Sequence, residues 1–322
     1  MPKVRVGVLR GGPSSEYDVS LKTGSAVLSN LSDHYIPVDI LITQDGLWHW
    51  QGVPIVPKDI LHRVDVIFNA LHGEYGEDGQ VQNILDSLGI PYTGSGRFAS
   101  AVAINKYLTK QALVKEGIKT PAYFLLQATD DLEDAAKSVF NKLSPPWIIK
   151  PADRGSSVGL FLAKHFAELV DILKLARQSS DLILIEEFIF GREATCGVVE
   201  DFRGFNPYAL PVIEIRTPKE KTFFDYEAKY SGITEEICPG CFNESTKKEI
   251  EFLSQKIHKT LGLKHYSRSD FIISKQGRVY FLEVNTLPGL TEESLLPKSL
   301  AAIGANHSQF IDHVLGLALV KK

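Results

Sequence analysis

Residues 268–285 read RSDFIISKQGRVYFLEVN. Both halves of this stretch are rich in β-branched and aromatic residues, which favour strands, and Gln276-Gly277 lies between them. A glycine at the second central position suits a two-residue turn. The stretch therefore predicts an antiparallel hairpin that turns at these two residues.

The register of this hairpin brings polar side chains together. A turn centred at 276–277 places Asp270 opposite Glu283 and Arg268 opposite Asn285. Opposed residues in an antiparallel pair point to the same face, as do residues two apart. We expect apolar residues on the other face, namely Phe271, Ile273, Leu282 and Val284.

Two carboxylates at this spacing would repel each other unless cations neutralise them. A set of oxygen ligands is what Mg²⁺ prefers when it also holds phosphate. The pattern therefore predicts a divalent metal site at Asp270, Glu283 and Asn285. The alternative is the solvated face of an edge hairpin, for which Lys or Thr would be more usual than two acids and an Asn.

A second motif, Lys150-Pro-Ala-Asp-Arg-Gly-Ser-Ser-Val-Gly159, follows a predicted strand at Trp147–Pro151. A lysine and several backbone N–H groups suit a polyphosphate, and such a loop can close as a lid, although taken alone it is equally a flexible turn. Downstream, Glu186-Glu187-Phe188-Ile189 and Glu193 put acids beside an apolar strand end. They suit an adenosine group, or else a charged domain hinge.

Two further motifs are weaker. Gly94-Ser-Gly96 before a helix resembles part of a dinucleotide-binding fingerprint, but the next strand ends at Gln127 rather than at the acid that would hold a ribose. A dehydrogenase is therefore disfavoured. Cys238-Pro-Gly-Cys241 has CxxC spacing without a second ligand pair, so neither a zinc site nor a redox pair is favoured.

Composition excludes several classes of protein. The formal net charge of −4 provides no basic excess for nucleic acid, and no segment approaches the roughly 20 apolar residues that a membrane helix requires. The apolar start at Val4–Leu9 is too short for a signal peptide, and three cysteines argue against a disulfide framework. We expect a cytoplasmic protein.

A chain of 322 residues fits two or three domains. The order of strands and helices predicts an α/β protein with three, at residues 1–96, 97–187 and 188–322. In the first, strands at 4–9 and 64–71 alternate with helices, as in a parallel sheet. A single helix over 99–116 should open the second domain. In the third, strands are expected near 193–200 and 208–216, followed by a helix over 246–261, the hairpin and two helices.

The ordered motifs resemble the ATP-grasp superfamily, which implies an N-terminal substrate domain followed by a two-domain ATP-grasp fold of α+β type. The N-terminal Gly11-Gly-Pro-Ser-Ser-Glu16, Leu71-His72-Gly73, Asp225-Tyr-Glu-Ala-Lys229-Tyr230 and Asn285-Thr-Leu-Pro-Gly289 are similar to D-alanine–D-alanine ligases over nearly the whole chain. The resemblance implies that two D-alanines are joined at the expense of ATP through an acyl phosphate, for peptidoglycan synthesis, in a homodimer.

The resemblance also implies site roles. ATP would be held by Lys106, Lys150, Ser157, Glu186, Glu187, Phe188, Ile189, Glu193 and Lys229, and two Mg²⁺ or Mn²⁺ ions by Asp270, Glu283 and Asn285. The first D-alanine would meet Glu16, Val19 and His72, and the second Ser294 and Leu295. Glu16, Ser156 and Tyr230 would fasten the mobile loops, and Arg268 with the Gly289 N–H would form the oxyanion site.

Some positions depart from the common pattern of these ligases. They are Glu74, Asn83, Ile104-Asn105 and Glu293, all beside the predicted binding residues. They put the second substrate in question, so D-lactate and D-serine remain alternative acceptors. A non-catalytic nucleotide-binding protein would be expected to lose a metal ligand or a phosphate lysine, and none of these is missing.

Overall fold

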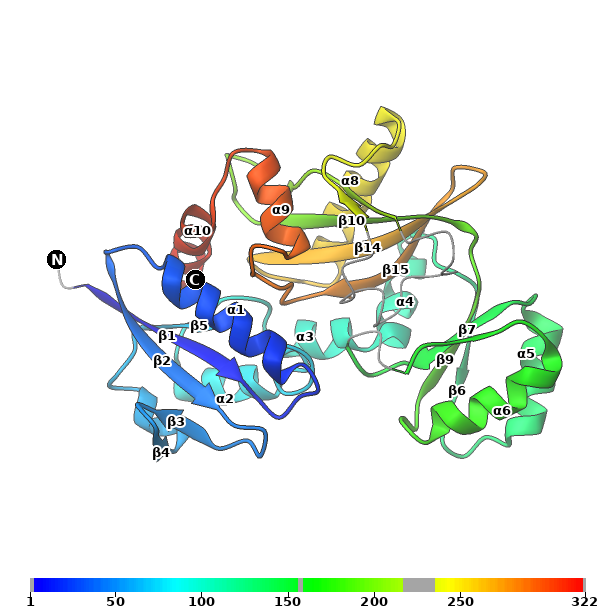
Figure 1. Cartoon of the computed structure of the whole chain (residues 1–322), viewed down its shortest axis with the longest axis horizontal. Coiled ribbons are helices and arrows are strands. Elements are labelled where there is room, and N and C mark those ends of the chain that lie inside the picture. Colours follow the sequence, from blue (N-terminus) through cyan, green and yellow to red (C-terminus); the bar gives the residue numbers. More distant parts are fainter. Residues whose placement is uncertain (1–2, 156–158, 217–234, 321–322) are drawn as a thin grey trace.

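The computed structural model describes residues 3–155, 159–216 and 235–320. Three sheets, each with its own helices, make up the molecule (Figure 1). Both ends of the chain lie toward the left of that view, where the N-terminal unit also lies, and the unit built on residues 123–187 lies at the opposite end.

The N-terminal sheet has the order β4-β3-β2-β1-β5. Its strands are β1 (Val4–Gly11), β2 (Tyr35–Ile42), β3 (Trp48–Trp50), β4 (Val53–Ile55) and β5 (Val66–Asn69). The strand β1 pairs in parallel with β2 and β5, which confirms the parallel core, while β3 and β4 add an antiparallel hairpin that the sequence pattern did not predict. Helices α1 (Tyr17–Asn30) and α2 (Gln80–Leu88) pack into different cores of this unit.

The central sheet has the order β6-β9-β7-β8 and is antiparallel. It contains β6 (Tyr123–Leu126), β7 (Trp147–Pro151), β8 (Phe161–Ala163) and β9 (Ile183–Glu187). Helices α5 (Leu132–Lys142) and α6 (Phe166–Arg177) supply Val139, Leu169 and Leu173 to the core beneath this sheet. The other face of the sheet is left to line a pocket.

The C-terminal sheet has the order β13-β12-β10-β14-β15, with β11 paired to β10. Its strands are β10 (Gly191–Val199), β11 (Tyr208–Ala209), β12 (Ile213–Arg216), β13 (Glu235–Ile237), β14 (Tyr266–Ser274) and β15 (Val279–Asn285). The helices of this unit are α8 (Glu244–Thr260), α9 (Leu295–Ala302) and α10 (His307–Leu319). The single strand expected over 208–216 is therefore wrong, because Leu210–Val212 separate β11 from β12.

The helix predicted over 99–116 is two helices, α3 (Arg97–Ile104) and α4 (Lys106–Lys115). Asn105 leaves the helical conformation at φ −85° and ψ 102°, and its side chain accepts a hydrogen bond from the Leu108 N–H. An Asn in this conformation is a helix N-cap, so the chain restarts a helix at the next residue. The break places Lys106 in the first turn of α4.

The hairpin turn was also predicted incorrectly. Ser274 pairs with Arg278, so the turn contains three residues, with Gly277 at φ +77°. A β-bulge then shifts the register between Asp270 and Phe271, and Leu282 is the extra residue on β15. The bulge compensates for the longer turn, so Asp270 lies opposite Glu283 and Arg268 opposite Asn285, as predicted.

The bulge changes the face to which Leu282 points. Phe271, Ile273 and Val284 are buried in the core behind the C-terminal sheet, as predicted, and Phe281 joins them there. Leu282, expected in that core, lines the pocket beside Glu283. An extra residue in one strand turns neighbouring side chains to one face, which explains the difference.

The cores show how the units are connected. Val8 and Phe68 of the N-terminal sheet share one core with Tyr266 and Phe310 of the C-terminal unit. The central unit has a core of its own. Helices α3 and α4 contribute Ala103 and Leu113 to the core of the C-terminal sheet. The boundaries at 96/97 and 187/188 remain a prediction.

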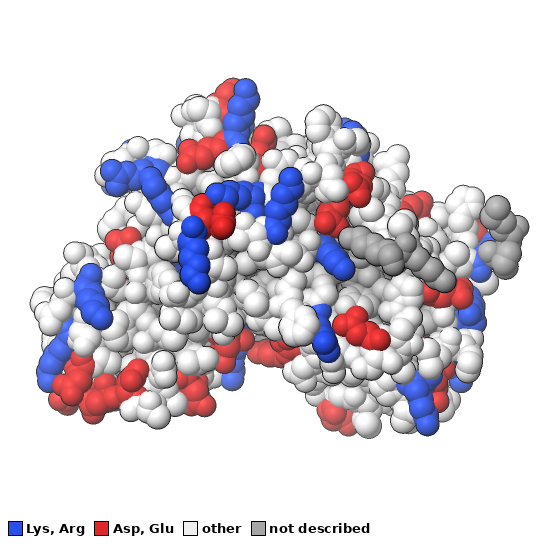
Figure 2. Space-filling model, turned by 180° about the vertical axis from the view of Figure 1, so that it is seen from behind, with Lys and Arg blue, Asp and Glu red and all other residues white. Residues whose placement is uncertain are grey.

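On the face shown in Figure 2, Lys and Arg side chains are interspersed with Asp and Glu side chains. Surfaces with mixed charges of this kind are ordinary for globular proteins. Among the described residues, no helix is long and apolar enough to cross a membrane.

Candidate functional site

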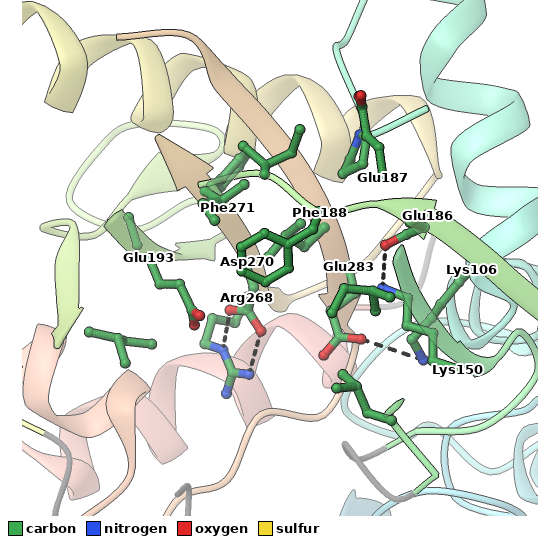
Figure 3. A pocket seen from close by; sticks show the side chains of 18 of the residues that line it. Lys106, Lys150, Glu186, Glu187, Phe188, Glu193, Arg268, Asp270, Phe271 and Glu283 are labelled. Carbon is green, nitrogen blue, oxygen red and sulfur yellow. Dashed lines mark hydrogen bonds and ion pairs between the residues drawn. The ribbon is translucent and has the colours of Figure 1, made fainter. Parts of the chain in front are cut away.

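A pocket lies between the central sheet and the hairpin of the C-terminal sheet (Figure 3). Its charged lining residues come from α4, β7, β9, β10, β14 and β15, and are Lys106, Lys150, Glu186, Glu187, Glu193, Arg268, Asp270 and Glu283. Apolar residues that include Phe188, Ile189, Leu282 and Leu295 complete the lining. The structure thus brings together most of the predicted nucleotide residues, although they are up to 87 positions apart in the sequence.

The hairpin wall carries the predicted metal ligands. Arg268 binds both carboxylate oxygens of Asp270, at 3.0 Å from Nε and 2.9 Å from Nη2, and Thr195 Oγ1 donates to Asp270 at 2.5 Å. Burial alone would lower the pKa of Arg268, but the charge of Asp270 and its hydrogen bonds raise it. The guanidinium is therefore a permanent cation against the carboxylate.

Glu283, opposite Asp270, extends toward the other wall. Its Oε2 lies 3.4 Å from Lys106 Nζ, and this Nζ also donates to the Arg154 carbonyl at 2.5 Å. Lys106 Nζ therefore bridges the hairpin and the loop that follows Lys150. The Asn285 side-chain oxygen accepts from the Leu287 N–H at 3.0 Å and so is held at the end of β15.

The central wall holds a group of three charges in which one carboxylate lies between two lysines. Glu186 Oε2 is 2.9 Å from Lys150 Nζ, and Oε1 is 2.8 Å from Lys110 Nζ. Burial would raise the pKa of Glu186, but the two lysines lower it, so the carboxylate stays ionised. Lys110 is fully buried, and burial lowers its pKa to about 8 against the attraction of Glu186.

The remaining acids of the pocket, Glu187 and Glu193, differ in orientation. The Glu187 carboxylate accepts from the Ala122 N–H at 2.9 Å and points away from the other labelled side chains in Figure 3. Glu193 extends toward Arg268 and Asp270 in the same view. Phe188 and Ile189 supply apolar surface between them. An apolar slot with a few charged groups at one end suits a nucleoside phosphate.

A smaller hollow adjoins the pocket and shares Lys106 and Glu283 with it. Glu16, Glu77, Gly155 and Asn285 also line it. Glu77 is buried and accepts from the Gly73 N–H at 3.0 Å, Thr286 Oγ1 at 3.1 Å and the Leu287 N–H at 3.2 Å. It thus ties the N-terminal unit to the loop after β15. Burial and the nearby Glu16 raise the pKa of Glu77 to about 7.

Two glycines allow three loops to meet at Glu16. A side chain added at Gly73 would lie 2.9 Å from Glu16 Oε2, and one added at Gly155 would lie 3.3 Å from the same atom. Gly73 also has φ +69°, a conformation that favours glycine. Glu16 thus lies against the loop that leads into Ser156.

The other predicted substrate residues are Val19, His72, Ser294 and Leu295, of which Leu295 lines the larger pocket. His72 is buried, with Nε2 2.8 Å from Thr23 Oγ1 and Nδ1 4.0 Å from Glu77 Oε1, so it also has the partners of a structural histidine. Val19 is half-buried on α1. Ser294 caps α9, and its Oγ is 2.8 Å from Thr291 Oγ1. Gly289 leaves no room for a side chain, because a Cβ there would lie 2.8 Å from Ser294 Oγ.

Four predicted site residues, Ser156, Ser157, Lys229 and Tyr230, lie outside the described residues. Across the described ranges, no three His, Cys, Asp or Glu side chains form a metal-binding group. The predicted metal-binding set of Asp270, Glu283 and Asn285 is not a group of this kind, because its third member, Asn285, supplies an amide oxygen. The oxygen donors of Asp270, Glu283 and Asn285, on facing positions of one hairpin, fit a hard divalent cation.

Comparison with known proteins supports the same interpretation. Residues 51–95 match the family described as the D-ala D-ala ligase N-terminus, and residues 113–316 match the D-ala D-ala ligase C-terminus. The chain belongs to the D-alanine–D-alanine ligase family. Relatives named D-alanine--D-alanine ligase include one from Fervidobacterium nodosum, 39% identical over 96% of this chain and 97% of its own length. Another, from Geotalea uraniireducens, is 39% identical over 98% and 96%.

Solved structures of this family share the ATP-grasp fold, which confirms the predicted fold class. The VanG D-Ala:D-Ser ligase from Enterococcus faecalis is 30% identical, with a TM-score of 0.88 over 98% of this chain and 100% of its own. The D-alanine--D-Alanine ligase from Bacillus anthracis complexed with ATP is 33% identical, with a TM-score of 0.81 over 98% and 97%.

Sequence reasoning assigned no role to Lys110 or Glu77. Lys110 follows Lys106 by four residues, which places both on one side of a helix, and this spacing was the available signal. Glu77 lies four residues after the quoted motif Leu71-His72-Gly73, yet its partners Thr286 and Leu287 are more than 200 residues away. No local pattern predicts such a contact.

Proposed function

We propose that this chain joins two D-alanines to D-alanyl-D-alanine at the expense of ATP, through an acyl phosphate. The observation that carries the proposal is the pocket in which Lys106 and Lys150 lie opposite the hairpin that carries Arg268, Asp270 and Glu283, with apolar residues completing the lining. A carboxylate is a poor electrophile, and phosphorylation gives it a leaving group. The cations on both walls would stabilise charge as it spreads over the transferring phosphoryl oxygens.

We further propose that Asp270, Glu283 and Asn285 hold two Mg²⁺ or Mn²⁺ ions. When bound, these ions would neutralise phosphate charge and orient the nucleotide. The protein's own part is to hold the three oxygen donors in place. Arg268 and Thr195 fix Asp270, and Lys106 pairs with Glu283.

The nucleotide assignment places phosphates at Lys106 and Lys150, together with Ser157 and Lys229, and adenosine along Phe188, Ile189 and Glu193. Glu186 supports the site by pairing with Lys150, and Glu187 does so by accepting a hydrogen bond from the Ala122 N–H. ATP held in this way presents its γ-phosphate to the smaller hollow, because Lys106 and Glu283 line both.

In that smaller hollow we place the first D-alanine, with its ammonium at Glu16 and with Val19 and His72 nearby. Glu16 with Ser156 and Tyr230 would hold the loops closed, which protects an acyl phosphate from water. Ser294 and Leu295 would hold the second D-alanine, while Arg268 and the Gly289 N–H would stabilise the oxyanion. A homodimer in the cytoplasm, supplying peptidoglycan synthesis, remains part of the proposal.

An alternative to the second D-alanine as acceptor has some support. The chain resembles the VanG D-Ala:D-Ser ligase with a TM-score of 0.88, and Glu74 and Glu293 depart from the usual family pattern. Either D-serine or D-lactate could occupy the same place as the second D-alanine. Tyr230 favours an amine acceptor, because its hydroxyl can anchor the loop that helps to select it.

The test measures phosphate release from ATP with Mg²⁺ and D-alanine alone, with L-alanine, or with D-alanine plus D-serine or D-lactate. We expect release with D-alanine and a product whose mass corresponds to D-alanyl-D-alanine. L-Alanine is the matched control, because it differs only in configuration. Phosphate release that does not depend on D-alanine would overturn the assignment. Preferential formation of a product that contains D-serine or D-lactate would make that compound the second substrate.

A further inference from the structure

Lys110 has no role in the function proposed above, although it lies one helical turn beyond Lys106. Its side chain is fully buried, and its ammonium pairs with Glu186 at 2.8 Å. The other oxygen of Glu186 pairs with Lys150, which lines the pocket, at 2.9 Å. Three elements, α4, β9 and β7, thus contribute one charge each to a buried row of lysine, glutamate and lysine.

Burying a lysine is costly, because its ammonium loses hydration. Lys150 alone would already give Glu186 a cationic partner, so the second lysine requires a reason. With only Lys150 as partner, Glu186 would form a neutral pair, and the carboxylate would cancel much of the field that Lys150 directs into the pocket. With Lys110 behind it, the row carries a net charge of one positive unit.

We propose that Lys110 is a positioning residue for the nucleotide: it balances the charge of Glu186 from behind, so that Lys150 presents an uncancelled positive charge to the phosphates. This inference rests on the proposed function, in which Lys150 binds ATP phosphates. Lys110 acts through Glu186 and does not touch the nucleotide. The ring of Tyr123, whose centroid is 5.9 Å from Lys110 Nζ, adds a weaker favourable contact.

A purely structural role for Lys110 makes a different prediction. A buried ion pair between α4 and β9 would stabilise the fold, and its loss would lower the thermal unfolding midpoint without a specific effect on nucleotide affinity. The charge-balancing role predicts instead that affinity follows the net charge of the row. That charge is one positive unit in the wild type, zero in K110M and one positive unit again in the double variant K110M/E186Q.

The experiment measures the Kd of ADP with Mg²⁺ by isothermal titration calorimetry, which requires no ligation. We expect K110M to weaken binding about tenfold, which corresponds to a single partly screened charge. Adding E186Q should restore most of the affinity, whereas K110R, which keeps the charge, should change it less than about threefold. K115M is the matched control, because Lys115 is an exposed lysine on the same helix.

K110Q serves as a second uncharged variant if K110M does not fold, because Gln can still hydrogen-bond to Glu186. Wild-type affinity in K110M or K110Q would overturn the proposal, as would failure of E186Q to restore affinity in either background. Phosphate release with D-alanine, measured on the wild type, reports separately on the proposed function. A wild type that binds ADP but ignores D-alanine would refute the ligase function alone.

Discussion

The two walls of the pocket hold their carboxylates in opposite ways. On the central wall, Glu186 is 3% exposed and lies between two lysines. On the hairpin wall, Asp270 and Glu283 are 19% and 33% exposed, and each has one cationic partner in the ion pairs described. The first wall has an excess of positive charge, whereas the second has accessible oxygens. The first is therefore suited to phosphate and the second to metal ions.

Removing one carboxylate charge from the hairpin wall should have the largest effect. Glu283→Gln keeps the size of the side chain but removes a charged metal ligand, so we expect turnover to fall by about 10³-fold, with the fold intact. Phosphate release at saturating ATP and D-alanine measures the effect, and the thermal midpoint reports on the fold. Glu292→Gln, at an exposed position nearby, is the control. Near-normal turnover of Glu283→Gln at ordinary Mg²⁺ would refute the metal role.

Glu77, which lines the smaller hollow, extends the comparison, because it is a buried carboxylate whose pKa is raised to about 7. In the folded protein it holds a proton at pH values where the unfolded chain has lost it. Its contribution to stability is therefore complete below about pH 4.5 and is lost as pH rises through about 7. The titratable and charged groups around Glu77 are Glu16, His72 and Arg268.

We therefore expect the wild type to lose more stability than Glu77→Gln between pH 5 and pH 7.5. The difference should be on the order of 1–3 kcal/mol, and thermal midpoints measured across this range would report it. Comparison of the two proteins cancels the other titrating groups. Glu74→Gln, in the same loop, serves as control and should follow the wild type. Parallel pH curves for wild type and Glu77→Gln would contradict the raised pKa.

The sequence predicted the hairpin wall better than the central wall. Asp270, Glu283 and Asn285 lie on one hairpin, where alternation along a strand determines which side chains share a face. The register was correct for an incomplete reason, because a longer turn and a bulge at Leu282 offset each other. Neither feature has a strong local signal, since Gln-Gly is compatible with two-residue and three-residue turns.

The central wall depends on contacts between distant segments. Lys150 and Glu186 were recognised as polar residues at strand ends, but their pairing follows from β7 and β9 being neighbours. Lys110 reaches Glu186 because Asn105 breaks the helix and starts α4 in a new direction. The helical periodicity over 99–116 is nearly continuous across that break. Such charge pairs are therefore determined by tertiary structure, which periodicity alone does not describe.

The smallest effect should come from the tip of the hairpin. Gly277 has φ +77°, and a Cβ there would have no neighbour within 4 Å, so Gly277→Ala adds backbone strain without a clash. The cost should be about 1 kcal/mol, and the thermal midpoint should fall by about 2–4 °C. Turnover should stay within about twofold of the wild type, because the bulge at Leu282 separates the tip from Asp270 and Glu283. Lys275→Ala, an exposed change in the same turn, is the control. A large loss of turnover in Gly277→Ala would mean that the turn, rather than the bulge, sets the register at the metal ligands.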